Sequence, residues 1–142
     1  MVELGASAVS GGEEVGGIIW PEFSLAKDGI FAAAKMAQMV CDSPLSGLVG
    51  TLPEYYNSKA KIEVASAGSK KLGLATAQSH ARSSGGRASL IDGVRVDFDD
   101  GWVIARASGT ENAMRVFAEG KSKKRAEQLM KEYKDVVENA CQ

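Results

Sequence analysis

The chain has 142 residues, of which 44% are hydrophobic and 25% charged, a composition typical of a soluble globular protein. Its 17 basic and 18 acidic side chains give a net charge of −1, which argues against general nucleic-acid binding, where a large basic excess is usual. No apolar run approaches the ~20 residues that a membrane helix needs, and the N-terminus lacks the basic start and apolar centre of a signal peptide.

The first forty residues predict a loop followed by a helix. The segment 10–17, SGGEEVGG, is too rich in glycine for a helix or for the interior of a regular strand. Ile18–Trp20 predicts a short strand that is stopped by the proline after it. Apolar residues at helical spacing predict a helix over 24–41, with an alternative start at which Asp28 is the N-cap.

The segment 42–57 contains two prolines and two glycines and predicts a linker with one short helical turn. We therefore place a domain boundary near Leu52, so that residues 1–52 form one region and residues 53–142 the other. One helix and a loop cannot bury their own apolar face, so we interpret 1–52 as the C-terminal remnant of an α/β domain plus a hinge.

The remainder of the chain shows clear strand and helix patterns. Lys59–Val64 alternates as a half-buried strand does, and Asp-Gly pairs between apolar runs indicate hairpins, because glycine accepts the positive φ of such turns. The expected strands are 59–64, 88–91, 94–98, 102–105 and 113–119, and the expected helices are 70–83, weak and interrupted at Gly73, and 122–140, with Ser122 as N-cap.

These elements predict an α+β fold. The connections between the last four strands are too short for parallel crossovers, so the strands must be antiparallel. An antiparallel sheet of four to five strands with helices on one face is the expected architecture, preceded by the partial α/β segment.

A donor-rich stretch, RASGTEN, follows the expected strand 102–105. Arg106 offers a planar fork of donors that suits two phosphate oxygens, and Ser108 and Thr110 add hydroxyls. Gly109 leaves backbone N–H groups open to close approach, and Arg115 can return to the same place. The alternative is a polar hairpin whose hydroxyls bond their own backbone.

A second candidate is the glycine-rich GGEEVGG. It is not a phosphate-binding P-loop, because no Gly-Lys-Ser/Thr follows, and its adjacent acids accept hydrogen bonds. Glu13 therefore suits a ligand with many hydroxyl groups. The alternative is a surface turn with solvated glutamates.

Both loops, in this order, resemble the α-D-phosphohexomutases, the family of phosphomannomutase, phosphoglucomutase and phosphoglucosamine mutase. The family's sugar loop, G-E-x-S-G-H/G, matches residues 12–17, and its phosphate loop, R-P/A-S-G/N-T-E-P, matches residues 106–112. DGIFAAAKMAQMV, LPEYYN and MRVFAEGKSKKRAEQLMKE are also similar to this family, so the resemblance spans nearly the whole chain.

The resemblance implies four-domain enzymes that move a phosphoryl group between the 1- and 6-positions of a hexose. The family uses a phosphoserine, Mg²⁺ and a hexose 1,6-bisphosphate intermediate. Its implied partners here are a hexose phosphate substrate and the remaining domains of a full-length enzyme, with neither nucleic acid nor membrane.

Carried over residue by residue, the resemblance implies that Glu13 accepts hydrogen bonds from ring hydroxyls of the sugar. It implies that four residues hold the phosphate that does not react: Arg106, Ser108, Gly109 and Thr110. Arg115 matches a nearby arginine of the family. Val15 stands where the family usually has serine, which removes one hydroxyl contact, and Asn112 replaces the usual proline, which loosens the loop.

The family's nucleophile loop, T-A-S-H-N-P, and metal loop, D-G-D-x-D-R, do not occur in this sequence. We therefore assign no catalytic or metal-ligating residue to this chain and expect it to be inactive alone. A stand-alone, noncatalytic anion-binding or interaction module is the alternative. The coding sequence upstream of Met1 distinguishes the two hypotheses.

Three further features have simpler interpretations. His80 is the only histidine and is expected on a helix surface, which excludes a multi-histidine metal site. The basic run 121–125 is a solvated face or extends a positive field toward the phosphate loop. Cys41 and Cys141 lie far apart, which favours a reduced, cytoplasmic protein over one with a disulfide.

Overall fold

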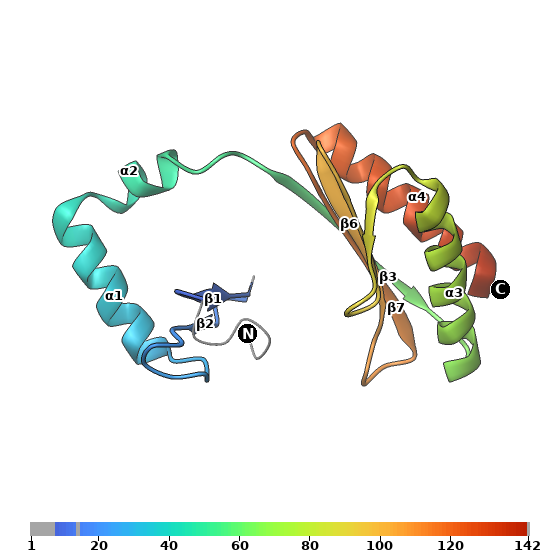
Figure 1. Ribbon diagram of the computed structural model, residues 1–142, viewed down its shortest axis with the longest axis horizontal. Coiled ribbons are helices and arrows are strands. Elements are labelled where there is room, and N and C mark those ends of the chain that lie inside the picture. Colours follow the sequence, from blue (N-terminus) through green and yellow to red (C-terminus); the bar gives the residue numbers. More distant parts are fainter. Residues whose placement is uncertain (1–7, 14, 142) are drawn as a thin grey trace. The chain divides into compact units, whose positions relative to one another are not determined.

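The computed structural model describes residues 8–13 and 15–141 (Figure 1). The chain divides into two units, Met1–Pro53 and Glu54–Gln142.

The N-terminal unit begins with a small hairpin. Strand β1 (Gly11–Gly12) pairs antiparallel with β2 (Ile18–Ile19), and Gly16 turns the chain between them at φ 88°. The segment 10–17 was expected to contain neither a helix nor the interior of a regular strand, and the structure has only the two-residue strand β1 there. Strand pairing at this length needs only backbone groups, which glycine has, and the isoleucines supply the partner strand.

Helix α1 (Gly29–Asp42) begins at the alternative start. The Oδ1 of Asp28 accepts a hydrogen bond from the N–H of Phe31 at 2.8 Å, as an N-cap does. The helix does not begin at Ser24, because Ser24 donates its N–H to the carbonyl of Trp20 at 2.8 Å and so continues a turn. A short helix, α2 (Leu45–Gly50), provides the helical turn expected in the linker.

The C-terminal unit contains an antiparallel five-stranded sheet in the order β3-β7-β6-β5-β4, which confirms the predicted α+β fold. Its strands are β3 (Tyr56–Glu63), β4 (Arg87–Ser89), β5 (Val94–Phe98), β6 (Gly101–Ala107) and β7 (Ala113–Gly120). Helices α3 (Ala67–Ser83) and α4 (Lys123–Cys141) lie side by side on one face of the sheet (Figure 1).

The two predicted Asp-Gly turns differ from each other. Gly93 has a φ of 85°, as expected, but strand β4 ends at Ser89, so Leu90 and Ile91 belong to the connection rather than to the strand. The second turn consists of residues 99–100, and Gly101 already belongs to β6. Glycine is needed there for space, because a Cβ at Gly101 would lie 2.4 Å from the carbonyl oxygen of Glu119.

Helix α3 is longer and more regular than expected, whereas α4 agrees with its prediction to within one residue at each end. Helix α3 is continuous from residue 67, and Gly73 does not interrupt it. Gly73 is buried, and a Cβ there would lie 2.9 Å from the Sγ of Cys141, so the glycine lets α3 and α4 approach each other. Ser122 accepts the N–H of Arg125 at 3.2 Å, as predicted for the N-cap of α4.

The core lies between the sheet and the two helices. Alternate strand residues point toward the helices, and residues at helical spacing on α3 and α4 meet them. The cluster comprises Ile62, Val64, Ala77, Ala81, Val94, Val96, Val103, Ala105, Met114, Val116, Ala118, Leu129, Tyr133 and Val137. The intervening strand residues therefore lie on the opposite, open face of the sheet. Among the described residues, no helix is both long and apolar enough to span a membrane.

Candidate anion-binding site

Arg106 lies near the end of β6, on the open face of the sheet. Its strand neighbour Ala105 is fully buried toward the helices, so alternation directs Arg106 the other way. The guanidinium donates from Nη1 to Oδ2 of Asp92 at 3.0 Å and lies 5.9 Å from the ring centre of Phe117. In this structure a carboxylate thus occupies one edge of the planar fork.

Arg106 is part of a row of three cations on neighbouring strands. Arg106 of β6 pairs in register with Arg115 of β7, and Arg115 pairs with Lys61 of β3. Like charges directly opposite each other on adjacent strands destabilise a sheet unless anions lie between them. We call Lys61, Arg115 and Arg106 the cation row.

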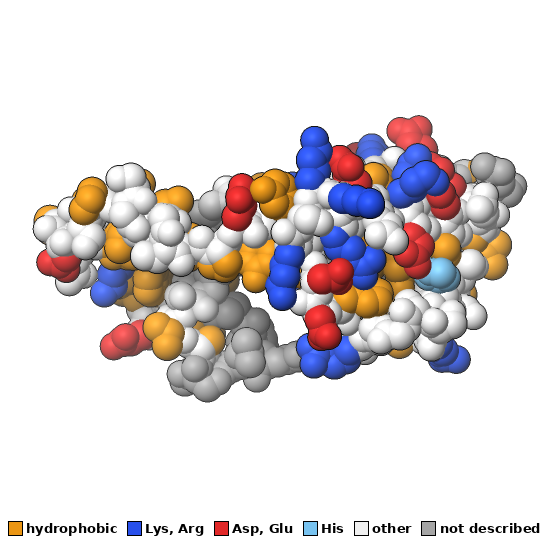
Figure 2. All heavy atoms as spheres, turned by 90° about the horizontal axis from the view of Figure 1, so that it is seen from above, with side chains coloured by type: hydrophobic (Ala, Val, Ile, Leu, Met, Phe, Trp, Pro, Cys, Tyr) orange, Lys and Arg blue, Asp and Glu red, His pale blue; other side chains and the backbone are white. Residues whose placement is uncertain are grey.

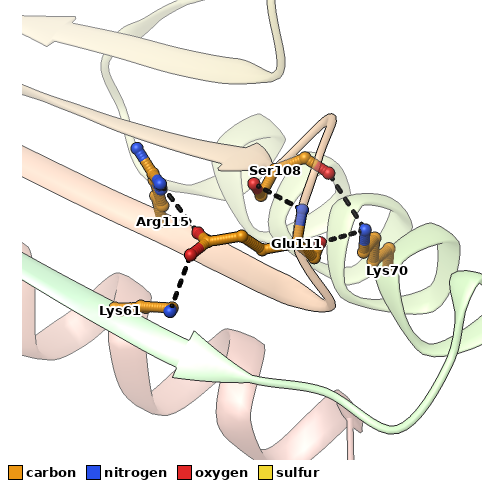
Figure 3. Close-up of polar contacts among 5 residues, drawn as sticks. All are labelled: Lys61, Lys70, Ser108, Glu111 and Arg115. Carbon is orange, nitrogen blue, oxygen red and sulfur yellow. Dashed lines mark hydrogen bonds and ion pairs between the residues drawn. The ribbon is translucent and has the colours of Figure 1, made fainter.

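Glu111 supplies the anion for one half of the cation row (Figure 3). Its Oε2 accepts from Arg115 at 2.8 Å and its Oε1 from Lys61 at 3.1 Å. The hydrogen bond from Arg115, followed by that from Lys61, holds the pKa of the Glu111 carboxyl below its ordinary value. Glu111 therefore remains ionised between the two cations and ties β3 to the loop before β7.

The loop between β6 and β7 also bonds internally. The Oγ of Ser108 accepts the N–H of Glu111 at 3.2 Å, and the N–H of Ser108 donates to the carbonyl of Ala113 at 2.8 Å. Lys70 of α3 donates to the carbonyl of Ser108 at 2.9 Å and to that of Glu111 (Figure 3). The hydroxyl of Ser108 thus bonds to the backbone of its own loop, as the alternative of a polar hairpin predicted. The hydroxyl oxygen acts there as an acceptor, so among the described residues its hydrogen is still available to a ligand.

Gly109 and Thr110 form the exposed tip of this loop. Within the described chain, their backbone N–H groups donate to no protein acceptor. A Cβ built on Gly109 meets nothing within 4 Å, and its φ is not positive. Neither backbone conformation nor crowding by the protein requires glycine here, so its effect is to leave the N–H groups accessible from outside.

The sugar-type loop lies in the N-terminal unit. Glu13 follows β1 and closes a turn, with its carbonyl accepting from Gly16 at 3.0 Å and its N–H donating to Gly17 at 3.1 Å. Its Oε1 accepts from Lys27, and among the described residues nothing occupies Oε2. Val15, the departure from the family pattern, is 79% exposed at the tip of the turn.

The structure adds to one sequence-based interpretation and decides between the alternatives of another. His80 lies on the surface of α3, as expected, and its Nε2 lies 2.7 Å from Oε1 of Glu132, so it links α3 to α4. The basic run 121–125 lies beside the β5–β6 turn, where the backbone N–H of Lys121 donates to the carbonyl of Asp100 at 2.9 Å and the Nε of Arg125 donates to Oδ1 of Asp100 at 3.0 Å. That is the opposite end of β6 from Arg106, about 17 Å away at ~3.4 Å per residue, so the run does not extend the field of the phosphate loop.

The structure thus brings together Arg106, Ser108, Gly109, Thr110 and Arg115 in one part of the C-terminal unit. Two cations that sequence reasoning missed, Lys61 and Lys70, belong to the same place. The alternation of 59–64 indicates that Lys61 faces away from the core, but strand order decides that it lies beside Arg115. Nothing in the sequence indicates that Lys70 reaches the loop.

Metal binding finds no support in this geometry. Within residues 8–13 and 15–141, no group of three or more His, Cys, Asp or Glu side chains is arranged to hold a metal ion. The Mg²⁺ implied by the family resemblance therefore has no fitting ligand set among these residues, and we derive no step through it.

An antiparallel five-stranded sheet with two helices on one face and a donor-rich loop between β6 and β7 defines an α+β domain with a candidate anion site. Residues 59–136 match the family described as "Phosphoglucomutase/phosphomannomutase, C-terminal domain", and residues 1–56 match "Phosphoglucomutase/phosphomannomutase, alpha/beta/alpha domain III". The chain belongs to the phosphoglucomutase/phosphomannomutase family.

Curated relatives agree with this assignment. A phosphoglucomutase/phosphomannomutase of Thermococcus kodakarensis is 40% identical over 84% of this chain and 26% of its own length. A probable phosphoglucosamine mutase of Methanosarcina acetivorans is 37% identical over 88% of this chain and 30% of its own. The chain thus spans between a quarter and a third of the length of these relatives.

Solved structures share the fold. A phosphoglucomutase/phosphomannomutase family protein of Burkholderia thailandensis has a TM-score of 0.75, with 20% identity, over 94% of this chain and 29% of its own. The N-acetylphosphoglucosamine mutase of Aspergillus fumigatus, in complex with glucose 1,6-bisphosphate, has a TM-score of 0.51, with 20% identity, over 83% of this chain and 22% of its own.

Proposed function

We propose that this chain is the C-terminal part of a phosphosugar mutase of the phosphomannomutase/phosphoglucomutase type. The full-length enzyme interconverts hexose 1- and 6-phosphates through a hexose 1,6-bisphosphate. The observation that carries the proposal is the exposed tip of the β6–β7 loop, where unbonded N–H groups lie next to Arg106 in a chain of this family.

In this proposal the 106–110 loop binds the phosphate that does not react. Arg106 exchanges Asp92, which is 73% exposed, for two phosphate oxygens, and the loop tip contributes neutral donors. Such a clamp supplies binding energy away from the reacting phosphate and holds the sugar in register. Arg115 stays on Glu111 and acts as a neighbouring positive charge.

Glu13 binds ring hydroxyls in the same proposal. Lys27 fixes one carboxylate oxygen, which leaves the other to accept from a sugar hydroxyl. The linker around 43–55 acts as a hinge that lets the C-terminal domain close on the sugar and release it again. A linker that stays equally protected from hydrogen exchange in free and sugar-bound enzyme contradicts the hinge. Residence in the cytoplasm stays a prediction.

Calorimetric titration of the 142-residue chain with glucose 6-phosphate and mannose 6-phosphate tests the clamp. We expect weak binding and no turnover, since the family's nucleophile and metal loops are outside this sequence. Arg106→Ala should weaken binding by about tenfold or more, the scale of a lost charged hydrogen bond. Lys124→Ala, in the first turn of α4 beside the β5–β6 turn, is the matched control and should bind normally. Equal binding by both variants rejects the clamp.

A further inference from the structure

Lys70 lies in the first turn of α3 and reaches across to the β6–β7 loop. A cation in the first turn of a helix opposes the helix dipole, so local chemistry does not favour lysine there. Its ammonium instead donates to the carbonyls of Ser108 and Glu111 (Figure 3). The side chain is half-buried, so these bonds are partly shielded from water.

These two bonds fix the direction of the loop's peptide groups. The carbonyl of Ser108 and the N–H of Gly109 belong to one planar trans peptide and point in opposite directions. Because the carbonyl faces Lys70, the N–H of Gly109 faces away from it, toward the outside of the loop. This N–H donates to no acceptor in the described part of the chain.

The charge of Lys70 also differs from that of its neighbours. Lys61 and Arg115 share the single carboxylate of Glu111, and Arg106 is paired with Asp92. Lys70 has only neutral carbonyl oxygens as partners, and no carboxylate lies within ion-pair distance of it among the described residues. Its positive charge therefore reaches the loop without a carboxylate to cancel it.

We propose that Lys70 is a positioning residue for anion binding: it holds the carbonyls of Ser108 and Glu111 on the inner side of the loop, so that the N–H of Gly109 points outward to an anion. This inference rests on the proposed function of the loop. It extends the site to α3, an element that none of the predicted site residues occupies.

Titration of the isotope-labelled 142-residue chain with inorganic phosphate, followed by the amide signal of Gly109, tests the inference. Lys70→Met should weaken phosphate binding by about tenfold or more and move the ligand-free signal of Gly109. Lys70→Arg should restore most of the affinity, because it keeps a charged donor. Lys71→Met is the matched control and should bind as the wild type does, since Lys71 is exposed and has no polar partner among the described residues.

The fluorescence of Trp102, measured for each variant with Trp20 replaced by phenylalanine, shows whether the C-terminal unit is folded. If Lys70→Met does not fold, Lys70→Gln replaces it, because glutamine is uncharged and its amide nitrogen stands one bond nearer the backbone than the lysine Nζ, too short to hold both carbonyls. Weakened phosphate binding by Lys70→Gln supports the inference and wild-type affinity overturns it. Wild-type affinity in a folded Lys70→Met also overturns it. Failure of the proposed function looks different: residues 106–110 of the wild type then do not respond to phosphate, and Arg106→Ala changes nothing.

Discussion

Both units of this chain contain a helix with apolar residues at helical spacing, but these residues are buried only in the C-terminal unit. Helix α1 has no buried residue, and Met36, Met39 and Val40 are between 42% and 46% exposed. Helix α4 has the same kind of spacing, yet Leu129 and Val137 are at most 1% exposed. Figure 2 shows hydrophobic side chains (orange) on the surface of the N-terminal unit and many charged ones on the C-terminal unit.

The difference lies in what each helix packs against. A broad sheet lies beneath α3 and α4, whereas the strands of the N-terminal unit contribute two residues each. Helical periodicity therefore predicts a helix, and the presence of a partner surface decides whether its stripe is buried. We expect the free energy of unfolding to be concentrated in the C-terminal unit.

The chain offers a direct way to follow the units separately, because each contains one of its two tryptophans. Trp20 lies in the N-terminal unit and Trp102 on β6. Replacing Trp20 by phenylalanine leaves Trp102 as the reporter of the C-terminal unit. The first three predictions below use this background in urea unfolding.

The largest effect is expected from removing a core side chain. Leu129→Ala should lower the free energy of unfolding reported by Trp102 by about 2–5 kcal/mol, because it leaves a cavity between α4 and the sheet. Met36→Ala on α1 is the matched control and should leave the Trp102 transition unchanged. Similar losses for both variants contradict the separation of the two units.

A smaller effect is expected from crowding a strand glycine. Gly101→Ala should cost about 1–3 kcal/mol, because the new methyl group meets the backbone of β7, which cannot move aside without disturbing the sheet. Gly109→Ala, where a Cβ has open space, should leave the stability unchanged. An unchanged midpoint for Gly101→Ala means that the backbones of β6 and β7 are not in such close contact.

Removing a helix cap is expected to have a smaller effect on stability, and each unit has a cap that can be removed. Ser66 caps α3 by accepting the N–H of Ser69 at 3.1 Å, and Ser66→Ala should lower the stability reported by Trp102 by about 1 kcal/mol. Asp28→Ala removes the cap of α1 and should reduce the helical circular dichroism signal without moving the Trp102 transition. A shift of that transition by Asp28→Ala argues against independent units.

The smallest effect concerns pH. The pKa of Glu111 is lower in the folded chain than its ordinary value of 4.5. Its ionised form therefore stabilises the fold at pH values above 4.5, and this contribution is lost as the pH falls through that value toward the lowered pKa. Urea midpoints measured from neutral to acidic pH should fall more steeply for the wild type than for Glu111→Gln. Parallel curves for the wild type and Glu111→Gln would show that the ionised carboxylate of Glu111 does not stabilise the fold.

Local patterns predicted most of the C-terminal fold. Alternation and Asp-Gly signals located the strands, and Ser122 correctly indicated the start of α4. What sequence could not supply was the tertiary context of single residues. Helix propensity alone predicts that Gly73 interrupts its helix, but α4 approaches α3 so closely at this position that the glycine allows the two helices to pack. Of the two starts that the sequence offered for α1, the one capped by Asp28 is found because the backbone of Ser24 bonds to the preceding turn.

The candidate site shows the same limit. The motif 106–110 and Arg115 were predicted from the sequence, and their binding roles stay proposals. Lys61 required knowledge that β3 pairs with β7, and Lys70 required the packing of α3 against the loop. His80 gained a partner in Glu132 for the same reason. Contacts between residues far apart in the chain are decided by topology, which local patterns do not contain.

The placement of β3 at the edge of the sheet has a consequence for folding kinetics. Strands β4 to β7 form successive hairpins, whereas β3 must wait for β7, since Glu63 pairs with Ala113. Closing that long loop costs more entropy than closing a hairpin, so we expect β3 to join the sheet last. Because Lys61 lies on β3, the cation row becomes complete only in this final step, and anion binding in a refolding experiment should appear together with it.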